Sequence, residues 1–147
     1  MRGFAAVAAL TLVAACHPAP SEVKATHAWV RLPAVAGNPG AGYFTLTADD
    51  KPRMLLAVSA PELAIRSELH ESMAGGGSMM SMKPLKQVSL SPGAAVTFAP
   101  GGKHVMFFDV SPKAKAGSQV PLTFTFADGK KIEVQATIVG AGDPEPK

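Results

Sequence analysis

Two histidines and two methionines within residues 70–106 have the types and the spacing to bind a metal. They are His70, Met82 twelve positions later, and the pair His104 and Met106 on either side of one valine. Thioether sulfur is a soft, uncharged ligand, and among metals common in cells it favours Cu(I) over Zn(II), Mg(II) or Ca(II). His104 and Met106 are two positions apart, so their side chains would point to the same side of a β-strand. The pattern predicts a copper site.

The other methionines and histidines are weaker candidates. Met73 and Met80 are candidate accessory ligands, although methionine more often fills irregular gaps in a core, which is the favoured role for Met79 and Met80. A lone histidine such as His17 or His27 is more often structural than a ligand. Met73, His27 and the N-terminal tether are left as candidates for a secondary Cu(II) site.

The four main residues resemble the motif of the periplasmic copper chaperones usually called the PCuAC family. That motif is a His, a Met twelve positions on, and a His-x-Met after a gap of twenty-one residues; His70, Met82, His104 and Met106 match it throughout. Some members have a methionine where this chain has Glu71. The resemblance implies a cupredoxin-like Greek-key fold and delivery of Cu(I) to the CuA centre of cytochrome c oxidase, directly or with a Sco-type thioredoxin-fold protein. It extends to residues 28–31, 43–46 and 122–126.

The first fifteen residues predict an export signal. Arg2 precedes an unbroken small and apolar run that is too short to remain in a bilayer as a helix. The run ends in Val-Ala-Ala-Cys, which resembles the lipobox of bacterial lipoproteins, so Cys16 is the expected lipidation site. An ordinary secretory signal that contains a cysteine by chance is the alternative. The predicted organisation is a signal at 1–15, a lipidated Cys and tether at 16–22, a copper-binding β domain at 23–139 and a flexible tail at 140–147.

Short apolar stretches separated by turn signals predict an all-β domain. The clearest is the segment 120–139, where apolar and polar residues alternate on both sides of Asp128-Gly129, a strong hairpin signal. A length of 147 residues allows one domain. We expect about 7–9 antiparallel strands in a sandwich or barrel.

Two of the predicted strands carry most of the site. The strand at 64–72 should place His70 near its end on the more polar face, with Ile65 and Leu69 on the other. In the strand at 104–110, the face of the two ligands continues into Phe108 and Val110, which should anchor it in the core. The glycine run at 74–78 is expected to turn the chain so that Met82 returns towards His70. Glu71 and Asp109 flank the ligands and are candidates for orienting an imidazole, with solvated or turn roles favoured.

Composition narrows the class of protein. Cys16 is the one cysteine, which excludes an intramolecular disulfide and argues against a blue-copper site with its thiolate ligand. The 14 basic and 11 acidic residues are spread along the chain, so nucleic acid is not an expected partner. We see no Ser-His-Asp or paired-carboxylate arrangement and do not expect an enzyme.

The leading hypothesis from the sequence is a monomeric, lipid-anchored Cu(I) chaperone of the periplasm or cell envelope that acts in copper homeostasis. Two alternatives stay open. One is an envelope protein that scavenges or stores copper and never transfers it. The other is a β-sandwich interaction module that binds no metal and whose methionines belong to its core.

Overall fold

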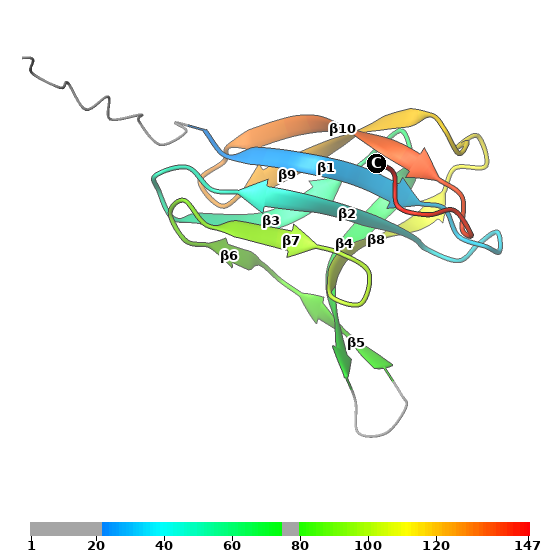
Figure 1. Cartoon of the computed structure of the whole chain (residues 1–147), viewed down its shortest axis with the longest axis horizontal. Helices are drawn as coiled ribbons and strands as arrows, with labels where there is room; N and C mark the ends of the chain where they lie inside the picture. The colour runs from blue at the N-terminus through cyan, green and yellow to red at the C-terminus, as the bar shows by residue number, and fades with distance from the viewer. Residues whose placement is uncertain (1–21, 75–79) are drawn as a thin grey trace, which may run out of the picture.

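The computed structural model describes residues 22–74 and 80–147, and its regular structure consists of strands (Figure 1). The predicted signal, Cys16, His17, the glycine run and Met79 lie outside the described residues. Among the described residues, no helix has the length and apolarity needed to cross a membrane. The strands are β1 (Lys24–Arg31), β2 (Gly40–Thr47), β3 (Arg53–Ser59), β4 (Ala64–Ala74), β5 (Met80–Leu85), β6 (Val88–Leu90), β7 (Ala95–Phe98), β8 (Lys103–Val110), β9 (Gln119–Phe126) and β10 (Lys131–Val139).

The all-β prediction is confirmed, with one strand more than the range expected. The described strands form a sheet in the order β5-β4-β8-β2-β1-β10-β9-β3-β6, and β7 also pairs with β2. The sheet curves round so that β4 and β3, near opposite ends of this order, come together: Ser67 on β4 donates a hydrogen bond of 2.6 Å to the carbonyl of Val58 on β3 (Figure 1). The additional strand is β5, which forms a hairpin with β4 that projects from the body of the domain (Figure 1).

Aromatic residues fill the space inside the curved sheet. Phe44 stacks on Phe98 at a centroid distance of 4.3 Å and meets Phe124 edge-on at 4.7 Å. Because side chains alternate along a strand, Phe124 brings Leu122 and Phe126 inward with it, and all three are buried as predicted. The predicted hairpin is also confirmed, since β9 and β10 pair on both sides of the Asp128-Gly129 turn.

The strand β8 is anchored by the face opposite to the one predicted. Val105 and Phe107 are fully buried, so His104 and Met106 lie on the other face of the sheet. β2 supports this arrangement through Gly42, where a Cβ atom would lie 2.6 Å from the ring of Phe107, so only glycine lets the two strands approach this closely.

Two further expectations fail, one at the far end of β8 and one near the start of β4. Asp109 has a φ of 55°, which re-aims the residues around it. Val110 consequently packs against the core and does not continue the face of His104. Ile65 on β4 is 87% exposed, although Leu69, four positions later, is buried as expected.

A bulge in β1 puts His27 and Trp29 on different faces of the strand. The pairing of β1 with β2 shifts between Thr26 and Trp29, and His27 has a φ of 51°. An inserted residue breaks the two-residue period of a strand. His27 is therefore exposed while Trp29 is buried, although residues two apart on a regular strand would share a face.

Candidate metal site

Strand register brings the four predicted ligands to one face of the sheet. β4 is the central strand of the three that carry them, with β8 on one side and β5 on the other. His70 on β4 pairs directly with His104 on β8, and Ser72, two positions after His70, pairs with Met82 on β5. Directly paired residues project to the same face, and so do residues two apart on one strand. His70, His104, Met106 and Met82 therefore lie on the same face.

The two imidazole rings are close neighbours, with centroids 5.9 Å apart and planes tilted by 32°. Beside them lies a hollow of about 380 Å³ to which Met82, His104 and Met106 all contribute. Burial raises the pKa of Tyr43, another wall residue, so that its phenol stays neutral at ordinary pH. The rest of the described lining is Pro39, Gly40, Ala41, Ser72, Pro100 and Gly101, so this part of the wall carries no carboxylate, lysine or arginine side chain.

Hydrogen bonds determine which nitrogen of each ring carries the proton. Nδ1 of His104 lies 3.0 Å from the carbonyl oxygen of Gly102, and because a carbonyl can only accept, Nδ1 donates. In the neutral ring this leaves the lone pair on Nε2. His70 is arranged the other way, since its Nε2 donates to a carboxylate oxygen of Glu68 at 3.0 Å and the lone pair is on Nδ1.

The lone pair on Nδ1 of His70 accepts no hydrogen bond within the described residues. Nδ1 is buried and has no hydrogen-bond partner there, although the side chain keeps 12% of its surface exposed. Buried polar nitrogens are nearly always paired, because an unpaired one loses its hydration without compensation. An atom in this condition, next to a second imidazole and two thioethers on the same face, is a candidate metal ligand.

Glu68 is a residue of this site that the sequence analysis did not predict. It lies two positions before His70, so strand alternation puts both side chains on one face, which is the signal that could have identified the contact; the predicted candidates were Glu71 and Asp109. Glu71 instead forms an ion pair of 2.7 Å with Lys103, and Asp109 is exposed. The hydrogen bond from His70 and, to a smaller extent, the charge of Arg66 lower the pKa of Glu68.

The two candidate methionine ligands differ in exposure, and the accessory candidates Met73 and Met80 both lie on the β4–β5 hairpin. Met82 is 59% exposed, whereas Met106 is half-buried. Met73 is exposed and pairs with Ser81, so it lies on the opposite face of β4 from His70 and is not placed to join the site. Met80 pairs with Ala74 near the end of the same ladder.

Comparisons with known proteins identify the family of this chain. Residues 23–138 match the family model described as "Putative lipoprotein LpqE-like". The chain is 25% identical over 117 residues to "Putative lipoprotein Lxx21020" of Leifsonia xyli subsp. xyli, an overlap that covers 79% of this chain and 69% of that protein.

Solved structures of PCuAC domains share the fold. The copper-bound PCuAC domain from PmoF2 superposes with a TM-score of 0.66 at 22% identity, covering 81% of this chain and 93% of the domain. Cu(I)-bound DR1885 from Deinococcus radiodurans is 28% identical with a TM-score of 0.58, covering 86% of this chain and 83% of that one. The resemblance seen in the sequence is therefore confirmed for the fold. This chain belongs to the LpqE-like lipoprotein family, and its domain has the cupredoxin-like fold of PCuAC domains.

Proposed function

We propose that this protein is a Cu(I) chaperone that holds its cargo with His70, Met82, His104 and Met106. The observation that carries the proposal is the shared face of β5, β4 and β8, where four neutral soft or borderline ligands from distant parts of the chain come together. Such a ligand set suits Cu(I) better than harder divalent ions. Two solved neighbours, the PmoF2 domain and DR1885, were determined with copper bound, which supports the choice of metal.

Transfer of the ion is favoured over storage by the accessibility of one ligand. Met82 is 59% exposed and lines the open hollow, so a partner can displace its sulfur first while the remaining ligands keep hold of the ion. Neutral ligands also need no thiol deprotonation, which makes exchange less dependent on pH than in a thiolate site. By resemblance to the PCuAC family, the recipient we propose is the CuA centre of cytochrome c oxidase, reached directly or with a Sco-type protein.

We further propose that the protein acts on the cell-envelope side of a membrane. Residues 1–15 would direct export and Cys16 would carry lipid, with residues 16–22 as the tether. Membership of a family described as lipoproteins supports this location. A Cys16→Ser variant should move from the membrane fraction to the soluble fraction; if it stays with the membrane, lipid at Cys16 is not the anchor.

Copper binding is tested by competition between the purified protein and a coloured Cu(I) chelator. We expect one tight site, weakened about 100-fold or more in Met82→Leu and Met106→Leu because leucine keeps the volume and removes the sulfur. Met73→Leu is the matched control, since Met73 is also exposed on the β4–β5 hairpin but lies on the other face. Equal affinity in all four proteins would favour the interaction module without metal.

Transfer is tested separately by mixing the Cu(I)-loaded protein with an excess of an apo CuA domain and separating the two. We expect copper to appear on the acceptor at a rate that depends on acceptor concentration, because the partner's ligands enter before Met82 has left. Copper that remains on this protein would favour scavenging or storage.

A further inference from the structure

We propose that Glu68 is a positioning residue, which holds the ring of His70 so that Cu(I) is bound through Nδ1 of His70 and through Nε2 of His104. This inference rests on the proposed copper site. It assigns opposite ring nitrogens to two histidines that face each other across β4 and β8. It also explains why the buried Nδ1 of His70 has no partner among the described residues.

The contact between Glu68 and His70 sets the direction of the ring. The two residues are two apart on β4 and project to the same face, and the carboxylate accepts from Nε2 of His70 at 3.0 Å. With its far nitrogen held in this way, the ring turns Nδ1 towards the protein. A hydrogen bond on the nitrogen that does not bind is the usual way proteins orient a metal-binding imidazole.

Glu68 is itself held in place by its neighbours on the same face. Arg66 forms an ion pair with Glu68, and the guanidinium carbon of Arg66 lies 3.9 Å from the centroid of the Phe108 ring. Arg66 pairs with Phe108 in the ladder, Glu68 pairs with Met106, and His70 pairs with His104. The outer face of β4 and β8 is thus a continuous row in which each polar side chain restrains the next.

His104 is oriented by the backbone instead of by a side chain. The carbonyl of Gly102 accepts from its Nδ1 at 3.0 Å, and the side chain is 5% exposed. No substitution at Gly102 removes this acceptor, because it belongs to the main chain. The orientation of His70 can therefore be altered by mutation of its partner while that of His104 stays unchanged, which provides an internal reference.

The first test is NMR spectroscopy of the full protein with ¹⁵N-labelled histidine. In the apo protein we expect a slowly exchanging Nε2 proton on His70, retained in Glu71→Gln and lost in Glu68→Leu. On Cu(I) loading, the nitrogen resonance that moves should be Nδ1 for His70 and Nε2 for His104. Copper on Nε2 of His70 in the wild type would overturn the proposal.

The second test is a double-mutant cycle read by chelator competition. Glu68→Leu should weaken Cu(I) binding about 10-fold or more, whereas Glu68→Gln, whose amide oxygen still accepts from the ring, should keep most of the affinity. On a His70→Ala background, Glu68→Leu should have no further effect, because Glu68 acts through His70. A loss of the same size on that background would mean that Glu68 binds copper itself.

Glu71→Gln is the matched control, since Glu71 is on the same strand one position beyond His70 and is paired with Lys103. It should leave the affinity unchanged. The failures are distinguishable: a wild type that does not bind Cu(I) refutes the proposed function, whereas tight binding that Glu68→Leu leaves intact refutes the positioning role alone. Thermal unfolding of each variant reports whether it is folded. We expect the Glu68 variants to fold, because the Glu68 side chain is 41% exposed.

Discussion

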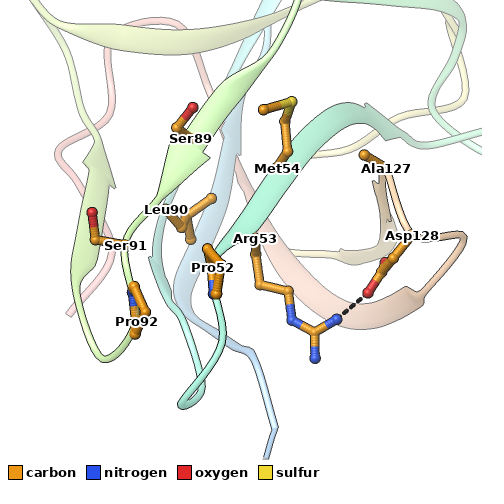
Figure 2. Close-up of a pocket in the computed structure, with 9 residues that line it drawn as sticks. All are labelled: Pro52, Arg53, Met54, Ser89, Leu90, Ser91, Pro92, Ala127 and Asp128. Carbon is orange, nitrogen blue, oxygen red and sulfur yellow. Dashed lines mark hydrogen bonds and ion pairs between the residues drawn. The ribbon is translucent and has the colours of Figure 1, made fainter.

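Two polar clusters differ in how their buried polar groups are paired: the Asp49 cluster just after the end of β2, and the histidine cluster beside the first half of β2. Asp49, which is 1% exposed, receives hydrogen bonds from the Arg53 side chain at 2.6 and 3.1 Å and from the Lys51 backbone at 3.2 Å. Arg53 also pairs with Asp128 (Figure 2). At the other cluster, His70 and His104 each use one ring nitrogen and leave a lone pair on the other. Within the described residues, the polar side-chain atoms of Asp49 and Arg53 all have partners, whereas Nδ1 of His70 has none.

The comparison shows that a hollow by itself does not identify a site. A hollow of about 330 Å³ lies beside Arg53 and is similar in size to the one beside His104. Its lining includes Pro52, Met54 and Leu90 (Figure 2). The difference is in the polar atoms. Those of Arg53 already have carboxylate partners, whereas the histidine cluster offers lone pairs to a ligand. Unused lone pairs, and not volume, point to binding.

The largest effect should come from His70→Leu, which separates function from stability. We expect Cu(I) affinity to fall at least about 100-fold, because one of four ligands is lost. The melting temperature should hold or rise, since leucine replaces a ring whose buried Nδ1 has no partner in residues 22–74 and 80–147. Chelator competition and thermal unfolding measure the two quantities. A marked fall in melting temperature would place His70 among the structural residues.

Asp49→Asn should lower the melting temperature and leave Cu(I) affinity unchanged, the reverse of His70→Leu. Removing the charge leaves Arg53 with Asp128 as its carboxylate partner in a largely buried setting, so we expect the melting temperature to fall by several degrees. Cu(I) affinity should stay unchanged because the cluster lies beyond the opposite end of β2 from the hollow. A matching loss of affinity would show that the two clusters are coupled.

Acid should abolish the difference in unfolding free energy between the wild type and Asp49→Asn. Hydrogen bonding from Arg53 lowers the pKa of Asp49 from 3.8 to about 2. A carboxylate whose pKa is lower in the folded state stabilises the fold above its unfolded pKa and loses that contribution as pH falls through the folded value. The gap in unfolding free energy should therefore be constant above about pH 4 and close towards pH 2. Denaturant titrations at a series of pH values test this.

The smallest effect should come from His27→Gly. His27 is exposed and has a φ of 51°, a conformation that glycine adopts without strain. We expect stability to rise by about 0.5–1 kcal/mol, with the Cu(I) site unaltered. Copper titration followed by denaturant unfolding would show both. A loss of bound copper would instead make His27 part of a metal site.

Local patterns in the sequence predicted much of the fold. Alternation in β9 and β10 and the Asp128-Gly129 turn were confirmed because a strand's two faces are set by neighbouring residues. The same rule failed at Val110, since the positive φ of Asp109 interrupts the period of β8, and it failed at Ile65 near the start of β4. It failed again at the bulge beside His27. A single residue in the left-handed region changes the direction of its neighbours' side chains. For residues other than glycine, residue type does not reliably predict this conformation.

By itself, the sequence determined which chemistry is available: two thioethers, two imidazoles and no thiolate in the β domain, at spacings that predict a soft metal. Only the tertiary structure decided that β4 lies between β5 and β8, which sets His70 opposite His104 and Met82 on the same face. It also decided that Glu68 and the Gly102 carbonyl take opposite nitrogens of the two rings. The physical reason is that strand order and ring orientation depend on contacts between residues far apart in the chain, which no local period encodes.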